Sequence, residues 1–122
     1  MEKQQILIVD DEEINREMLL EMFYDEREAY ELLEARNGKE AVDMIESNHR
    51  LVLILLDVVM PVMDGYKVLE YMQKRNLLNE VPVILITGET IKDSEGIAYS
   101  FGVADVIHKP FYPHIVKRRS RN

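Results

Sequence analysis

Three short apolar runs in this sequence each end on a polar side chain. The runs, with the polar residues that follow them, are residues 6–9 with Asp10 and Asp11, 51–56 with Asp57, and 81–86 with Thr87. Continuous apolar runs of this length are typical of strands in a parallel sheet whose two faces are both covered. The carboxyl ends of such strands meet at one edge, where open α/β sheets bind their ligands. The sequence therefore predicts an α/β protein whose chemistry lies at that edge.

Stretches of helical periodicity alternate with the apolar runs, which is typical of βαβ units around a parallel sheet. We predict five strand and helix pairs. The remaining strands are predicted at 30–35 and 104–108, and the helices at 13–27, at 39–47, from Tyr66 to Met72 after an Asp64 cap, at 91–101 before Gly102, and from Pro113 onward. The first helix should bury one face, because apolar residues recur there at three- and four-residue intervals. These residues are Ile14, Met18, Leu19, Met22 and Phe23.

Composition and charge limit the classes to which the chain can belong. Its 122 residues, 47% of them hydrophobic, suit a single domain that needs no disulfide or metal to fold. There is no cysteine, and no apolar stretch approaches the roughly 18 residues of a membrane span, so we expect a soluble cytoplasmic protein. The net charge of −8 repels phosphate backbones, so the expected partners are proteins or cations rather than nucleic acid.

The predicted last helix is short and basic at its end. Its apolar positions Ile115 and Val116 are followed at once by the segment from Lys117 to Arg121. We interpret residues 1–122 as one domain, the N-terminal fragment of a longer chain with its last helix truncated. The basic segment is most simply a solvated helix end, where cations are favoured.

Five polar side chains should converge at the carboxyl edge of the predicted sheet: Asp10, Asp11, Asp57, Thr87 and Lys109. Two unit charges about 4 Å apart interact by roughly 4 kcal/mol near a protein surface, so clustered carboxylates repel unless a cation bridges them. Oxygen ligands without cysteine suit Mg²⁺. Lys109 and Thr87 could hold the remaining oxygens of a tetrahedral anion. We interpret this set as a site for phosphoryl transfer to Asp57.

The same residues carry a resemblance to a known family. The segments are Asp10-Asp11, the run from Asp57 to Gly65 (Asp-Val-Val-Met-Pro-Val-Met-Asp-Gly), Thr87-Gly88 and Lys109-Pro110-Phe111. In this order, over nearly the whole chain, they resemble a two-component response-regulator receiver domain. The resemblance implies a flavodoxin-like, doubly wound five-stranded parallel sheet in the order 2-1-3-4-5 with five helices.

The resemblance also implies a role for each acidic residue. Asp57 would accept a phosphoryl group from a histidine kinase or phosphotransfer protein. Asp11 and Asp57 would bind Mg²⁺ directly, Asp10 would act through a metal-bound water, and Val59 would contribute its backbone carbonyl. The only chemistry would be phosphorylation and slow dephosphorylation of the domain itself, so we do not expect an enzyme that acts on other molecules.

Three further residues are implied to transmit the signal. Lys109 would pair with Asp57 and then with the phosphate, and the peptide before Pro110 would be cis. Thr87 would move toward the phosphate and alter the face made by the fourth helix, fifth strand and last helix. A homodimer could form through that face, and a downstream effector domain is expected in the same chain.

Two positions depart from the family pattern. Val106 stands three residues before Lys109, where the family usually has an aromatic residue that swings inward with Thr87. Valine has one stiff side-chain torsion, so the signal should travel through loop movement or a dimer rearrangement instead. Val59 offers no hydrogen bond to orient an attacking water, which predicts a phosphoryl group that persists longer than with a polar residue there.

Other interpretations of these residues are open. Asp10 and Asp11 could cap a helix, and Asp57 could be a turn residue before Pro61. The chain could be a degenerate receiver that acts as an interaction or dimerisation module without phosphorylation. A Mg²⁺-dependent aspartyl phosphatase would need an acid two residues after its nucleophile, and Val59 occupies that place.

Overall fold

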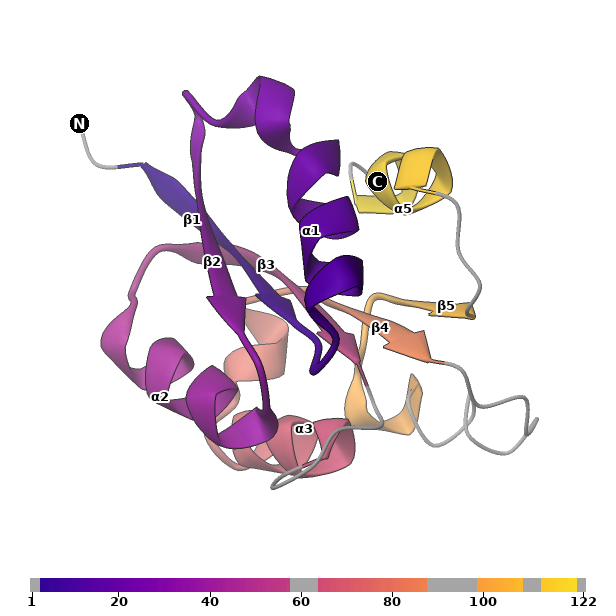
Figure 1. Cartoon of the computed structure of the whole chain (residues 1–122). Helices are drawn as coiled ribbons and strands as arrows, with labels where there is room; N and C mark the ends of the chain where they lie inside the picture. Colours follow the sequence, from indigo (N-terminus) through magenta and orange to yellow (C-terminus); the bar gives the residue numbers. More distant parts are fainter. Residues whose placement is uncertain (1–2, 58–63, 88–98, 109–112, 121–122) are drawn as a thin grey trace.

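A five-stranded parallel sheet forms the centre of the computed structural model, which describes residues 3–57, 64–87, 99–108 and 113–120. Figure 1 shows the strands, whose spatial order is β2-β1-β3-β4-β5. They are β1 (Gln4–Val9), β2 (Tyr30–Ala35), β3 (Leu51–Asp57), β4 (Val83–Thr87) and β5 (Asp105–His108). All four neighbouring pairs are parallel, so the predicted order and direction are confirmed.

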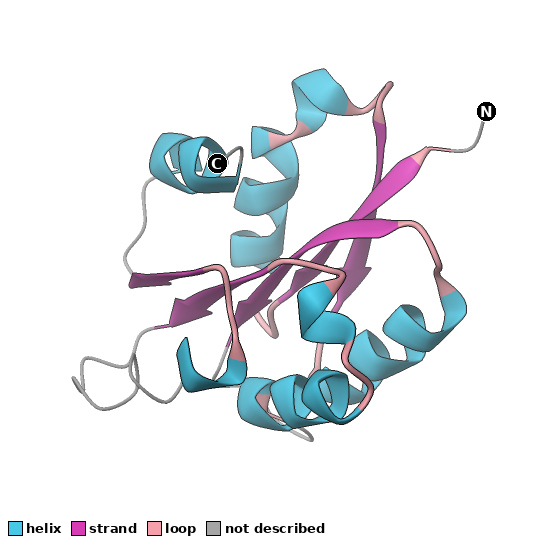
Figure 2. Ribbon diagram, turned by 180° about the vertical axis from the view of Figure 1, so that it is seen from behind, coloured by secondary structure: helices cyan, strands magenta, loops and turns pink. Residues whose placement is uncertain are grey.

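Helices cover both faces of the sheet, with α1 and α5 on one side and α2 and α3 on the other (Figures 1 and 2). Their bounds are α1 Glu13–Met22, α2 Gly38–Ser47, α3 Gly65–Lys74 and α5 Pro113–Ser120, and two 3₁₀ turns lie at η1 (Tyr24–Glu26) and η2 (Leu77–Asn79). Residues 91–98 of the predicted fourth helix lie outside the described residues. Residues 99–101 are helical, and Gly102 ends this helix with a φ of +98°, as predicted.

Alternating side chains of the apolar strands pack into two separate hydrophobic cores, one on each face of the sheet. Leu7, Ile54 and Leu56 contribute to the core under α2 and α3, whereas Ile8 and Leu55 contribute to the core under α1. All five of these side chains are at most 1% exposed. Because successive side chains point to opposite faces of a strand, a continuous apolar run is required to fill both cores.

Two side-chain caps start helices at the carboxyl edge of the sheet. Asn37 Oδ1 accepts a hydrogen bond from the Glu40 N–H at 2.9 Å, and α2 begins at the next residue. Asp64 Oδ1 accepts from the Lys67 N–H at 3.0 Å, so the predicted cap of α3 is confirmed. Each cap satisfies one of the backbone donors that a helix leaves unpaired at its start.

The first helix differs from the prediction in length and in its buried face. It ends at Met22 rather than Arg27, because the Phe23 N–H turns back to the Leu20 carbonyl at 3.1 Å and a 3₁₀ turn follows. Ile14 is 70% exposed and Met18 is 37% exposed, so the prediction that both are buried is wrong. The helix instead turns Arg16 inward with Leu19 and Met22, because the Arg16 guanidinium finds polar partners below the helix.

The fourth strand begins two residues later than the predicted start. The Val81 N–H donates to the Leu77 carbonyl at 2.9 Å and completes η2, and Pro82 has no N–H to offer a ladder. The strand therefore starts at Val83 and extends through Thr87. Among the described residues, no helix combines the length and apolarity that crossing a membrane requires.

Candidate functional site

Three aspartates meet where β1 and β3 end. Asp10 and Asp11 follow the last residue of β1, and Asp57 is the last residue of β3. One carboxylate oxygen from each lies within 4.8 Å of the other two. Asp10 is 1% exposed and Asp57 is 3% exposed, whereas Asp11 is open to solvent. The structure thus brings together three of the five predicted pocket residues.

The neighbouring strands and helix hold Asp10 firmly. Its N–H donates to the Ala35 carbonyl of β2 at 3.1 Å, which continues the β1 to β2 pairing by one residue. Its Oδ1 accepts from the Glu12 N–H at 2.9 Å, and its own carbonyl accepts from Arg16 Nη1 at 2.8 Å. Backbone and side chain are therefore both positioned before any ligand binds.

The donor set suits a small hard cation. Three carboxylates this close repel one another, and at about 4 Å each pair costs between roughly 1 and 4 kcal/mol depending on solvation. A divalent cation relieves that repulsion, and oxygen-only ligands favour Mg²⁺ or Ca²⁺ over softer metals. Because Mg²⁺ keeps several waters and uses few carboxylates, one exposed and two buried carboxylates fit it well.

The remaining predicted site residues divide into two groups. Thr87 is the last residue of β4 and pairs in register with His108 of β5. The residue before it, Ile86, pairs in register with Asp57 of the neighbouring strand β3. The backbone of Thr87 therefore lies at the same edge as the three aspartates. Val59, Lys109 and Pro110 lie outside the described residues, so their roles, and the cis peptide, stay predictions.

Val106 is a core residue on the face covered by α2 and α3. It pairs in register with Leu85 of β4, is 5% exposed and packs in the same apolar cluster as Val103. The Val106 N–H donates to Asp105 Oδ1 at 2.8 Å. A buried valine thus fills the position that the sequence identified as unusual.

Sequence reasoning missed Arg16 and Glu34. Arg16 is 8% exposed, and its Nε lies 3.2 Å from Glu34 Oε1 on β2. The sequence carries one signal for this arrangement, since Arg16 stands three residues before Leu19 and six before Met22. This spacing places Arg16 on the buried stripe of the helix.

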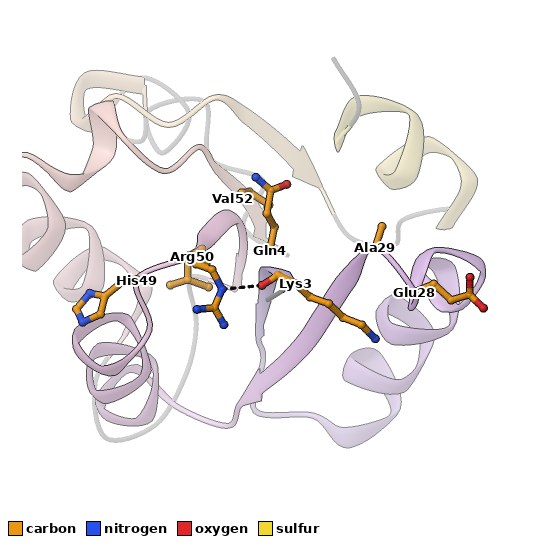
Figure 3. Close-up of a pocket in the computed structure, with 8 residues that line it drawn as sticks. Lys3, Gln4, Glu28, Ala29, His49, Arg50 and Val52 are labelled. Atoms are coloured by element: carbon orange, nitrogen blue, oxygen red, sulfur yellow. Dashed lines mark hydrogen bonds between the residues drawn. The ribbon is translucent and has the colours of Figure 1, made fainter. Parts of the chain in front are cut away.

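A hollow lies at the opposite, amino edge of the sheet (Figure 3). It encloses about 670 Å³. Its lining residues are Lys3, Gln4, Glu28, Ala29, His49, Arg50, Leu51 and Val52. Arg50 Nε donates to the Lys3 carbonyl at 2.8 Å, drawn as a dashed line in Figure 3, and Lys3 Nζ donates to the Arg27 carbonyl at 2.8 Å. This hollow is remote from the acidic cluster, so its size gives it no claim to the same chemistry.

Comparisons with known proteins agree on one family. The family described as the response regulator receiver domain matches residues 6–119. The transcriptional regulatory protein SrrA of Staphylococcus aureus is 36% identical over 115 residues, which are 94% of this chain and 45% of the relative. The chain therefore spans about half the length of the curated relatives that it matches.

Solved structures of receiver domains have the same fold. The Francisella response regulator 1452 receiver domain has a TM-score of 0.85 and 25% identity, over 98% of this chain and 94% of that one. A CheY-like receiver domain protein from Methanospirillum hungatei has a TM-score of 0.85 and 26% identity, over 98% of this chain and 92% of that one.

Proposed function

The chain belongs to the response-regulator receiver family, and from this premise we propose that it is a phosphorylation-dependent switch in which Asp57 is the phosphoacceptor. The observation that carries the proposal is the convergence of Asp10, Asp11 and Asp57 within 4.8 Å at the end of β1 and β3. A structural role for three clustered acids is a poor alternative, because their repulsion opposes folding.

The proposed reaction is transfer of a phosphoryl group to a carboxylate oxygen of Asp57. A bond forms between that oxygen and phosphorus, while the phosphorus–nitrogen bond of a donor phosphohistidine breaks and its electron pair returns to the imidazole. The product is an acyl phosphate. Bound Mg²⁺ would supply charge neutralisation for the incoming phosphoryl oxygens.

Each residue at the edge has a separate task in this proposal. Asp57 is 3% exposed, and a carboxylate oxygen of Asp57 lies within 4.8 Å of oxygens of Asp10 and Asp11. Asp11 and Asp57 would hold Mg²⁺ directly, and Asp10 would act through a metal-bound water. Thr87 and Lys109 would contact the transferred phosphoryl group, with the Val59 carbonyl completing the metal ligands. The chemistry is confined to the domain itself, so we class the chain as a switch and not as an enzyme acting on other molecules.

The partners follow from the family and from the length of the relatives. We assign a histidine kinase, or a phosphotransfer protein, as the phosphoryl donor. The SrrA relative is named as a transcriptional regulatory protein, and 45% of it is covered. We therefore propose that the output depends on an effector region elsewhere in a longer protein, and that the face containing β5 and α5 forms a homodimer or contacts that effector.

Intact mass spectrometry after incubation with acetyl phosphate and Mg²⁺ tests the proposal. One phosphoryl adduct is expected on the wild-type chain, and none on Asp57→Asn or in EDTA. Asp43→Asn is the matched control, because Asp43 is an exposed aspartate on α2 outside the acidic cluster, and it should gain the adduct normally. A wild-type chain that binds Mg²⁺ but gains no adduct would overturn the proposal in favour of a receiver that only binds partners.

A further inference from the structure

The buried polar side chains of the described residues gather unevenly. Four polar or charged residues are buried there, namely Gln5, Asp10, Arg16 and Asp57, and the last three surround the acidic edge. Asp10 and Asp57 belong to the proposed metal site. A buried arginine beside them needs a separate explanation, because a positive charge beside a cation site opposes cation binding.

Arg16 links three elements that meet at this edge. It lies in α1, its Nη1 donates to the Asp10 carbonyl at 2.8 Å, and its Nε pairs with Glu34 Oε1 of β2 at 3.2 Å. The Glu34 side chain is 45% exposed, so the pair is anchored at the buried guanidinium and open at the carboxylate. The planar fork of arginine can make both contacts at once, which a lysine ammonium cannot do with the same geometry.

The contact to the Asp10 carbonyl acts directly on the metal site. That carbonyl belongs to the planar peptide unit that joins Asp10 to Asp11. The preceding peptide is fixed as well, since the Asp10 N–H donates to the Ala35 carbonyl at 3.1 Å. Rotation of the Asp10–Asp11 peptide would swing the Asp11 carboxylate, which is exposed to solvent.

We propose that Arg16 is a positioning residue for Mg²⁺, because it locks the peptide between Asp10 and Asp11 so that the two carboxylates face Asp57. The inference rests on the proposed function. Arg16 touches neither the metal nor the phosphoryl group, and Glu34 orients the guanidinium from the other side. The arrangement parallels the outer partners that orient ligands around other metal sites, whose loss typically weakens metal binding about 10- to 100-fold.

Electrostatics and positioning predict opposite signs when the guanidinium is removed. If Arg16 acted only through its charge, its removal would strengthen Mg²⁺ binding, because a cation near the dication would be gone. If Arg16 positions the acidic loop, its removal weakens binding in spite of the lost repulsion. The sign of the change in the Mg²⁺ dissociation constant therefore separates the two roles.

Isothermal titration calorimetry with MgCl₂ measures that sign on three variants. Arg16→Met keeps most of the apolar stem and removes every donor, and we expect its dissociation constant to rise about tenfold. Arg16→Lys should lie between Arg16→Met and wild type. Arg36→Met is the matched control, because it removes one positive charge from an exposed arginine that pairs with Glu40, and its dissociation constant should stay within about twofold of wild type. Equal or tighter binding by Arg16→Met would overturn the proposal.

Amide hydrogen exchange without metal is a second measurement, and it distinguishes a local change near Asp10 from a loss of overall stability. The Glu12 N–H, which donates to Asp10 Oδ1, should exchange faster in Arg16→Met, while the Ile8 and Leu55 amides in the strands keep their protection. A uniform loss over the chain would assign Arg16 a general structural role and overturn the proposal. If Arg16→Met fails to fold, Arg16→Lys carries both measurements.

The two proposals fail in different ways. A wild-type chain without measurable Mg²⁺ binding would overturn the proposed function and this inference together. Normal Mg²⁺ binding by wild type and by Arg16→Met alike would overturn only the role of Arg16. At saturating Mg²⁺ we expect Arg16→Met to form the Asp57 phosphoryl adduct, because the phosphoacceptor is intact, whereas at limiting Mg²⁺ adduct formation should lag behind wild type.

Discussion

The two edges of the sheet treat their charged side chains differently. At the amino edge, Lys3 donates to the Arg27 carbonyl and Arg50 donates to the Lys3 carbonyl, so cations are used to tie neighbouring segments together. At the carboxyl edge, Asp10, Asp11 and Asp57 bring charges of one sign within 4.8 Å. The amino edge gains stability from its charges, whereas the carboxyl edge concentrates a repulsion that a ligand can relieve.

Cavity size and functional chemistry are separate properties in this molecule. The hollow at the amino edge encloses about 670 Å³, yet its cations are engaged with backbone carbonyls. The acidic edge has the charges that cannot satisfy one another. Sites that bind ions commonly carry such an unfavourable arrangement, which lowers stability until the ion arrives.

The largest expected difference between the two edges is in how much Mg²⁺ raises the free energy of unfolding. A ligand present at one hundred times its dissociation constant adds about 2.7 kcal/mol to the free energy of unfolding. We expect this gain for wild type and for Arg50→Ala, and little of it for Asp57→Asn. Urea denaturation with and without Mg²⁺ measures the difference. The contrast between the edges breaks down if Asp57→Asn is stabilised as much as wild type.

A change at the amino edge should lower stability and leave the metal response alone. Gln5 is 4% exposed, and its Nε2 donates to Glu31 Oε1 and to Asn48 Oδ1, both at 2.9 Å. Replacing Gln5 with leucine should cost about 1 kcal/mol, because the loss of two hydrogen bonds at about 1 kcal/mol each is partly offset by removal of the buried Gln5 Oε1, which has no hydrogen-bond partner among the described residues. Chemical denaturation gives this cost, and the Mg²⁺-dependent gain measured on the same variant should equal that of wild type.

The acidic edge should show an effect of the opposite sign when metal is absent. In EDTA at neutral pH, Asp57→Asn removes one of three repelling charges, and we expect its free energy of unfolding to rise by about 1 kcal/mol. Most substitutions of buried residues are destabilising, so an increase is a specific signature of relieved repulsion. A decrease, measured by thermal and urea unfolding together, would mean that the Asp57 carboxylate is stabilised within the fold.

The fold could be predicted from the sequence because the strands carry continuous apolar runs. Leu51 to Leu56 fills both cores, and the polar residues that end β1 and β3 had to meet once the strands were parallel. The convergence of the aspartates could be predicted for the same reason. These features follow from the apolar pattern of the strands and from the order of the strands in the sheet. Both are properties of whole segments and not of single contacts.

The buried face of α1 and the role of Arg16 could not be predicted from such patterns in the sequence. Apolar spacing placed Ile14 and Met18 on a buried face, but both are exposed, since Arg16 reaches the Asp10 carbonyl and Glu34 across β1 and β2. These contacts join α1 to the end of β1 and to Glu34 of β2, which is eighteen residues away in sequence. Gln5 is buried at the other edge for the same kind of reason, because its partners belong to β2 and to the end of α2.

One acidic residue at the carboxyl edge, Glu40, is held by hydrogen bonds within the chain, as the cations of the amino edge are. Glu40 lies in the first turn of α2, where Oε1 accepts from the Arg36 N–H at 3.0 Å and Oε2 accepts from Arg36 Nη2 at 3.1 Å. The backbone hydrogen bond from Arg36, followed by the side-chain hydrogen bond, holds the pKa of Glu40 below its usual value. Arg36 thus supplies both a backbone and a charged side-chain donor to this carboxylate.

The smallest effect that we expect is the change in the Glu40 pKa, and in stability, when Arg36 is replaced. Because the pKa of Glu40 is lower in the folded chain, its contribution to stability is present above the unfolded-state pKa and is lost as pH falls through the folded-state value. Carbon-13 NMR titration of the Glu40 carboxyl group in Arg36→Ala should give a pKa higher than in wild type. It should stay below the ordinary value, since the backbone N–H at position 36 remains. The pair is exposed, so its effect on unfolding should be small and should fade with salt. A Glu40 pKa unchanged by Arg36→Ala would assign the whole shift to the backbone donor.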